Sequence, residues 1–105
     1  MYDKKTLNRP NKRVVPWNEI KLLVFDCDGV LTDGRFVYGT NNLEIKNFHG
    51  HDGLGFKLLQ HTDIMVCFIT GRSSEALERR CLDLNITYLF QNVANKLECL
   101  DNLLQ

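Results

Sequence analysis

The chain has very little proline and no excess of charge of either sign. Only two of its 105 residues are proline, Pro10 and Pro16, so the residue that most disrupts helices and central strands is missing from 17 onward. The 13 basic side chains balance the 13 acidic ones, which gives no whole-chain field to attract nucleic acid. No apolar stretch approaches the roughly 20 residues of a membrane-spanning helix. We therefore expect neither nucleic acid nor a membrane as a partner.

The first 18 residues lack the pattern of a folded element. The only acid here is Asp3, whereas five side chains are basic: Lys4, Lys5, Arg9, Lys12 and Arg13. No apolar core of the signal-peptide type is present, so we expect a cytoplasmic protein with a flexible basic leader over 1–18. A nucleic-acid-binding arm would interleave aromatic with basic residues, and that pattern is missing. A linker from a longer polypeptide is the remaining alternative.

The cysteines form no paired motif. None of the four lies in a C-x-x-C pair, and they are scattered along the chain: Cys27, Cys67, Cys81 and Cys99. A structural zinc site needs clustered ligands, which this spacing does not provide. We expect reduced thiols that are mostly buried as small hydrophobic residues. Cys27 stands between two aspartates, and since side chains alternate in an extended chain, its thiol should point away from both.

The most informative segment is an apolar run that ends in two carboxylates. Residues 22–25 read Leu-Leu-Val-Phe and predict a strand buried on both faces, as in a parallel sheet. Asp26 and Asp28 follow directly, at the end of the strand where ligands bind in open α/β sheets. Gly29 allows a sharp turn and a close approach to a ligand.

Two neighbouring carboxylates repel each other unless a cation neutralises them. Their hard oxygen ligands suit Mg²⁺, so Asp26 and Asp28 are candidate metal ligands. One carboxylate could attack a phosphoryl group to form an aspartyl-phosphate, while the other moves protons to the leaving group and from water. The alternative is that the two aspartates only open a turn, but the strand before them and the Gly-Val-Leu-Thr after them favour chemistry.

The rest of the chain alternates strands with helices. Further buried strands are predicted at 64–69 and 86–90, after a first strand at 20–25. Alternating residues at 35–38 and 43–48, joined by a turn at 39–42, predict a β-hairpin beside the site. Strands that alternate with helices imply an α/β fold with a parallel sheet and right-handed crossovers.

Three helices are expected between and after these strands. Asp52 could cap the first, which runs to about His61 and should turn Leu54, Leu58 and Leu59 toward the core. Ser73 is the expected cap of the second, whose stripe is Leu77, Cys81 and Leu84. Asn95 is expected to start the third.

Four further residues are candidates for binding an anion near the two aspartates. Thr70 ends the second strand, where its hydroxyl could bond a phosphate oxygen, and Gly71 follows it. The fork of Arg72 suits a substrate carboxylate or phosphate, and Lys96 could neutralise phosphate charge. Asp52 could contact substrate or only cap its helix, and the sequence leaves both open.

Several short motifs along the chain together carry a resemblance. The segment 26–32 matches the D-x-D-G-x-x-T signature of haloacid dehalogenase-like phosphatases, and further matches follow in order at 33–34, 52–55, 69–72 and 95–97. The chain most resembles the cap-less branch that contains 3-deoxy-D-manno-octulosonate 8-phosphate phosphatases, nonulosonate 9-phosphate phosphatases and the C-terminal domains of acylneuraminate cytidylyltransferases. This resemblance implies a Rossmann-like three-layer fold with a parallel sheet and a β-hairpin flap.

The resemblance also implies an activity and a site. It implies a Mg²⁺-dependent phosphomonoesterase for a sugar-acid phosphate, with Asp26 as nucleophile and Asp28 as general acid and base. Thr70 and Lys96 would hold the phosphate, with Gly71, Arg72 and Asp52 also at the substrate. In this branch the hairpin helps to assemble a homotetramer, so its aromatic side chains would lie in an interface or pack on their own domain: Phe36, Tyr38 and Phe48.

One part of the family pattern is not found. The acidic Gly-Asp-Asp-type loop that completes the metal site in the family has no counterpart before Gln105. We therefore expect residues 19–105 to be a partial phosphatase domain, incomplete at the C-terminus, with its first strand as a sheet edge. The alternative function is a non-catalytic oligomerisation module or inactive fragment, resembling the phosphatase-like domain of acylneuraminate cytidylyltransferases.

Overall fold

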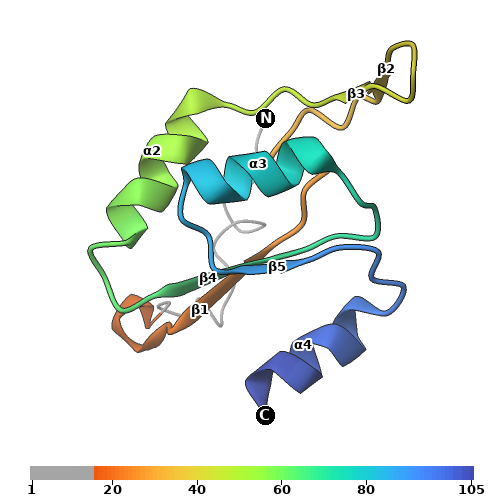
Figure 1. Cartoon of the computed structure of the whole chain (residues 1–105). Coiled ribbons are helices and arrows are strands. Elements are labelled where there is room, and N and C mark those ends of the chain that lie inside the picture. Colours follow the sequence, from red (N-terminus) through yellow and green to blue (C-terminus); the bar gives the residue numbers. More distant parts are fainter. Residues whose placement is uncertain (1–15) are drawn as a thin grey trace, which may run out of the picture.

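The computed structural model describes residues 16–105, so the leader predicted at 1–18 lies almost wholly outside the described residues. Strands and helices alternate after a short 3-10 turn (Figure 1). In chain order they are η1 (Trp17–Glu19), β1 (Leu22–Phe25), β2 (Val37–Tyr38), β3 (Glu44–Ile45), α2 (Gly50–Leu59), β4 (Met65–Ile69), α3 (Glu75–Asp83), β5 (Tyr88–Phe90) and α4 (Lys96–Leu104). No helix among the described residues is long and apolar enough to cross a membrane.

The main sheet is parallel and has the strand order β1-β4-β5. Phe25 pairs with Phe68, and Phe68 with Leu89, so the carboxyl ends of all three strands lie at the same edge. In Figure 1, α2 and α3 cover one face of this sheet and α4 lies on the other. The predicted three-layer α/β fold is therefore confirmed, and β1 forms one edge of the sheet, as expected.

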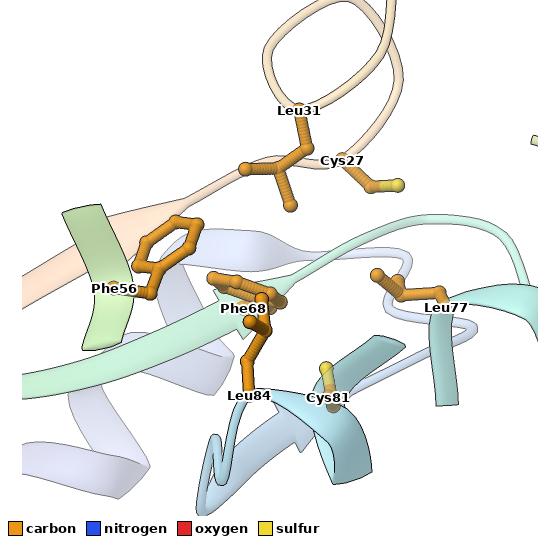
Figure 2. Close-up of a cluster of buried hydrophobic side chains, with 7 residues drawn as sticks. All are labelled: Cys27, Leu31, Phe56, Phe68, Leu77, Cys81 and Leu84. Carbon is orange, nitrogen blue, oxygen red and sulfur yellow. The ribbon is translucent and has the colours of Figure 1, made fainter. Parts of the chain in front are cut away.

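A cluster of buried hydrophobic side chains lies between the sheet, α2 and α3 (Figure 2). At its centre the rings of Phe25, Phe56 and Phe68 pack edge to face, with centroids 5.1 to 6.0 Å apart. Complete burial of one such ring stabilises a fold by about 1.5–3 kcal/mol. The stripe predicted for the second helix closes the cluster from the α3 side: Leu77, Cys81 and Leu84.

The core-facing side of α2 differs from the prediction. Leu54 and Leu58 are 59% and 60% exposed, whereas Phe56 is buried and Leu59 only partly so. Gly53 is the other buried residue of the helix, where a Cβ atom would meet the guanidinium of Arg80 at 2.7 Å. The prediction for Leu54 and Leu58 is wrong because α2 packs through Gly53 and Phe56, which lie three residues apart.

Both predicted helix caps are also wrong. His49 caps α2, since its Nδ1 accepts a hydrogen bond from the His51 N–H, and Asp52 lies within the first turn instead. Ser74 caps α3 in place of Ser73, one residue later than predicted, and its Oγ accepts from the Leu77 N–H. The start of the last helix predicted at Asn95 is confirmed, since Asn95 caps α4 and its Oδ1 accepts a hydrogen bond from the Glu98 N–H.

The hairpin is present but short. Val37 pairs with Ile45 and Tyr38 with Glu44 in an antiparallel ladder of two residues per strand, shorter than the predicted strands. The turn between them uses two asparagines at positive φ, 60° and 62°, and closes with a hydrogen bond from the Gly39 N–H to the Leu43 carbonyl. The hairpin extends away from the layers of the fold in Figure 1.

Candidate active site

The loop that follows β1 is held in a tight turn. The carbonyl of Cys27 accepts hydrogen bonds from three successive N–H groups, those of residues 30, 31 and 32. The Oγ1 of Thr32 then accepts from the N–H groups of Gly29 and Gly34, at 3.3 and 3.2 Å. Both glycines have φ near +85°, which other residues rarely adopt. The turn therefore fixes the backbone on both sides of Asp28.

The thiol of Cys27 points into the core, as predicted. It is 1% exposed and lies in the same cluster as Leu31 and Leu77 (Figure 2). Burial, reinforced by the nearby Asp28 carboxylate, raises the pKa of this thiol to about 11. Because the thiolate is the nucleophilic form of cysteine, Cys27 anchors the loop and is no nucleophile at neutral pH.

Asp26 faces a cation from the last helix of the chain. Its Oδ1 accepts a hydrogen bond from the Cys27 N–H at 2.8 Å and lies 3.1 Å from the Nζ of Lys96. Lys96 is the first residue of α4, which Asn95 caps, so the position of the amine is set by the start of that helix. The two side chains are 40% and 48% exposed and remain accessible to a ligand.

Asp28 faces two other cations. Its Oδ1 lies 2.7 Å from the Nζ of Lys46, and its Oδ2 lies 4.0 Å from the Nε of Arg72. Arg72 follows β4, as Asp28 follows β1, so the carboxyl ends of neighbouring parallel strands bring these two together. Glu44 lies 3.2 Å from Lys46 and 3.6 Å from Arg72, so three carboxylates and three cations meet at this end of the sheet.

Thr70 and Gly71 hold the loop after β4 against the loop after β5. Thr70 is 3% exposed, donates its N–H to the Phe90 carbonyl and accepts from the Val93 N–H. Its Oγ1 accepts from the Arg72 N–H at 3.4 Å. A Cβ atom at Gly71 would lie 3.6 Å from the Val93 carbonyl oxygen, an ordinary contact. The backbone of this loop is therefore fixed by the end of β5.

Asp52 is not part of the ion-paired group. It lies in the first turn of α2 and lines a recess of about 590 Å³ beside the loop that follows β1. The other residues lining this recess include Thr32, Asp33, Phe48, His49 and His51. Of the predicted site residues, the ion pairs bring together Asp26 with Lys96 and Asp28 with Arg72, and Asp52 borders the same loop from another side.

The sequence interpretation missed Lys46 and the hairpin residues around it. The Lys46 side chain is only 3% exposed. Its Nζ lies 3.2 Å from Oε1 of Glu44 and also contacts Oδ1 of Asp28. Burial by itself lowers the pKa of Lys46, but its contacts with Asp28 and Glu44 outweigh that effect and raise it. A signal was available, since residues 44, 46 and 48 share one face of an alternating segment.

Comparison with known proteins gives close sequence relatives. No family model matches the chain. It is 44% identical over 86 residues to the 3-deoxy-D-manno-octulosonate 8-phosphate phosphatase KdsC of Escherichia coli, and 49% identical over 71 residues to KdsC of Haemophilus influenzae. The first match covers 82% of this chain and 46% of the relative. The chain thus spans about half the length of the curated relatives it matches.

Solved structures agree with these relatives. A 3-deoxy-D-manno-octulosonate 8-phosphate phosphatase from Moraxella catarrhalis, in complex with magnesium, phosphate and KDO, superposes with a TM-score of 0.77 at 40% identity, over 80% of this chain and 48% of that one. The cobalt-bound enzyme from Haemophilus influenzae gives 0.76 at 44% identity, over 81% of this chain and 50% of that one. The resemblance to haloacid dehalogenase-like phosphatases is therefore confirmed in sequence and in fold, over about half the length of these relatives.

Proposed function

We propose that this chain is a Mg²⁺-dependent phosphomonoesterase, or a part of one, that hydrolyses a sugar-acid phosphate such as 3-deoxy-D-manno-octulosonate 8-phosphate or a related nonulosonate 9-phosphate. The observation that carries this proposal is the pairing of two carboxylates at one strand end with separate cations, Asp26 with Lys96 and Asp28 with Arg72 and Lys46. The KdsC relatives and the KDO-bound neighbour support the substrate class.

The donor set suits Mg²⁺, although it is small. No group of three or more metal-binding side chains is found among residues 16–105, and Asp26 and Asp28 are the two ligands that the sequence predicts. Mg²⁺ is commonly bound by one or two carboxylates, with waters and substrate phosphate completing its shell. We assign Asp26 through its carboxylate, and Asp28 through its backbone carbonyl, as the residues that would hold the ion. When bound, the ion supplies positive charge beside the reacting phosphoryl group.

Each step of the reaction is assigned to a residue of this chain. An oxygen of Asp26 attacks phosphorus while the bond to the sugar oxygen breaks, and Asp28 gives that oxygen a proton. Asp28 then takes a proton from water, whose oxygen attacks the aspartyl-phosphate and releases phosphate. Lys96 balances the negative charge on the phosphoryl oxygens, and Thr70 with Gly71 forms the opposite wall of the phosphate site.

Arg72 and Asp52 are assigned to the rest of the substrate. The Arg72 side chain is 42% exposed, and a guanidinium can bind the carboxylate of a sugar acid with two parallel hydrogen bonds. Asp52 lines the recess beside the same loop, where it could accept hydrogen bonds from sugar hydroxyl groups. We also propose a cytoplasmic homotetramer, in which the exposed hairpin side chains Phe36 and Tyr38 contact a neighbouring copy.

The test is phosphate release from 3-deoxy-D-manno-octulosonate 8-phosphate by the chain, with Mg²⁺ and with excess chelator. We expect turnover that requires Mg²⁺ and is lost in Asp26→Asn, while Asp63→Asn, an exposed acid outside the site, keeps it. If neither the wild-type chain nor Asp26→Asn releases phosphate, but both assemble into the same oligomer, the chain is a non-catalytic assembly module. Equal turnover in the chelated sample would exclude the metal dependence.

A further inference from the structure

Lys46 carries a charge that the fold has almost completely removed from water. Its side chain is 3% exposed, with Nζ 2.7 Å from an Asp28 oxygen and 3.2 Å from a Glu44 oxygen. Burying a cation is costly unless close contacts with opposite charges compensate for the lost hydration. A surface lysine would escape that cost by turning outward, so the position of Lys46 depends on the two carboxylates that it joins.

The two carboxylates belong to different parts of the molecule. Glu44 is in β3 of the hairpin, while Asp28 is in the turn that follows β1. Lys46 itself follows β3, so its pair with Asp28 fastens the base of the hairpin to that turn. Since Oδ1 of Asp28 is engaged at 2.7 Å, the same contact fixes the rotation of the carboxylate.

Arg72 makes a second attachment from the other side. Its Nη2 donates to the Tyr38 hydroxyl at 3.1 Å and lies 3.6 Å from Glu44, and its guanidinium stacks 4.6 Å from the centre of the Phe36 ring. All three partners are in the hairpin or next to it. The hairpin is thus joined to the loop after β1 through Lys46, and to the loop after β4 through Arg72.

We propose that Lys46 is a positioning residue that fastens the β2–β3 hairpin to Asp28, so that the position of the hairpin and the orientation of this carboxylate change together. The inference rests on the proposed function only in assigning proton transfer to Asp28. The hairpin has two residue pairs of its own ladder, too few to hold it in place alone. Loss of Lys46 leaves the attachment through Arg72, so the hairpin is held less firmly and the Asp28 carboxylate can rotate.

The first test needs no turnover. Amide hydrogen exchange is measured in Lys46→Met, Lys46→Arg and the control Lys57→Met, which removes an exposed lysine from α2. We expect the Gly39 amide, which closes the hairpin, to exchange about tenfold faster or more in Lys46→Met and near the wild-type rate in Lys46→Arg and Lys57→Met. The amides of β4 serve as a reference for global unfolding. If the β4 amides of Lys46→Met also lose protection, the comparison is made in Lys46→Gln instead. Exchange of the Gly39 amide at the wild-type rate in the variant that stays folded overturns the proposal.

The second test compares two substrates that differ in their leaving group. This comparison separates a role of Lys46 in positioning Asp28 from a role in folding. Proton donation by Asp28 is needed for an alkyl leaving group but hardly for p-nitrophenolate. We expect Lys46→Met to lower kcat on the sugar-acid phosphate at least about tenfold more than on p-nitrophenyl phosphate, with KM nearly unchanged and with recovery in Lys46→Arg. Equal losses on both substrates would overturn the role in positioning. If the wild-type chain turns over neither substrate, the proposed function fails and hydrogen exchange alone decides whether Lys46 fastens the hairpin.

Discussion

Lys96 reaches Asp26 from the first turn of α4, with its Nζ 3.1 Å from the carboxylate Oδ1. Both side chains are close to half exposed, so water screens their attraction, and exposed pairs of this kind contribute less than about 1 kcal/mol to stability. The pair therefore has little importance for the fold. Its exposure has a different consequence, because a negatively charged ligand can approach the amine from solvent while the helix start keeps the amine in place.

The variant Lys96→Met should separate these two roles. We expect its free energy of unfolding to stay within about 1 kcal/mol of the wild type, because the lost pair is exposed. Its affinity for inorganic phosphate should fall about tenfold or more, the usual effect of losing one hydrogen bond to a charged group. Calorimetric titration with phosphate and urea denaturation measure the two quantities. Lys57→Met is the matched control, and equal phosphate affinity in all three chains would contradict the prediction.

Two glycines have room for an added methyl group, but alanine should change the stability of the fold in opposite directions at the two positions. Gly34 has φ +85°, so Gly34→Ala strains the backbone even though its Cβ atom would meet nothing closer than 3.6 Å. We expect a loss of about 1–2 kcal/mol in the free energy of unfolding. Gly55 lies inside α2 with no atom within 4 Å of the added Cβ, so Gly55→Ala should stabilise the helix by up to about 1 kcal/mol. Urea denaturation checks both, and a stabilised Gly34→Ala would show that the turn is not held at this φ.

The order of strands and helices could be predicted because each apolar strand is short and is separated by clear breaks. The strand at 64–69 and the stripe of Leu77, Cys81 and Leu84 are found almost where the sequence placed them. The packing side of α2 could not be predicted in the same way. Its leucines at 54 and 58 are as apolar as the buried Phe56, and the choice between them depends on the contact of Gly53 with Arg80, which belongs to another helix.

The site shows the same division between local and distant determinants. Asp26, Asp28, Thr70 and Lys96 could be singled out because each stands beside the end of a strand or the start of a helix in the sequence. For Lys46 the sequence offers only a shared face with Glu44 and Phe48 in an alternating segment. Its burial against Asp28, 18 residues away, cannot be read from that local pattern.

The buried Phe68 should be the most sensitive position of the core. It is 0% exposed and packs edge to face against Phe25 and Phe56. Phe68→Ala removes these contacts and leaves a cavity, which costs about 3–5 kcal/mol of unfolding free energy. Leu82→Ala is the control, since Leu82 is 78% exposed and its truncation should cost less than about 0.5 kcal/mol. Thermal or urea denaturation of both variants tests the difference, and a similar loss in both would place the core elsewhere.

The buried thiols should make the fold less stable in alkali. Burial is the main cause that raises the pKa of Cys27, Cys67 and Cys81 to about 11 each, from an ordinary value of 9.0. Between pH 9 and pH 11 the unfolded chain therefore releases thiol protons that the folded chain retains. The contribution of each protonated thiol to stability is fully present below pH 9. It is lost as the pH rises through this window and amounts to on the order of 2 kcal/mol per thiol.

A cysteine variant isolates this effect from other groups that ionise in alkali. We expect Cys81→Ala to be less stable than the wild type at pH 8, because a buried sulfur is lost. The difference should narrow as the pH rises toward 11, because the variant no longer loses the contribution of that thiol. Urea midpoints in a reducing buffer at steps from pH 8 to pH 10.5 give the two curves. Parallel curves would mean that the Cys81 thiol ionises as readily in the folded chain as in the unfolded one, contrary to its burial at 4% exposure.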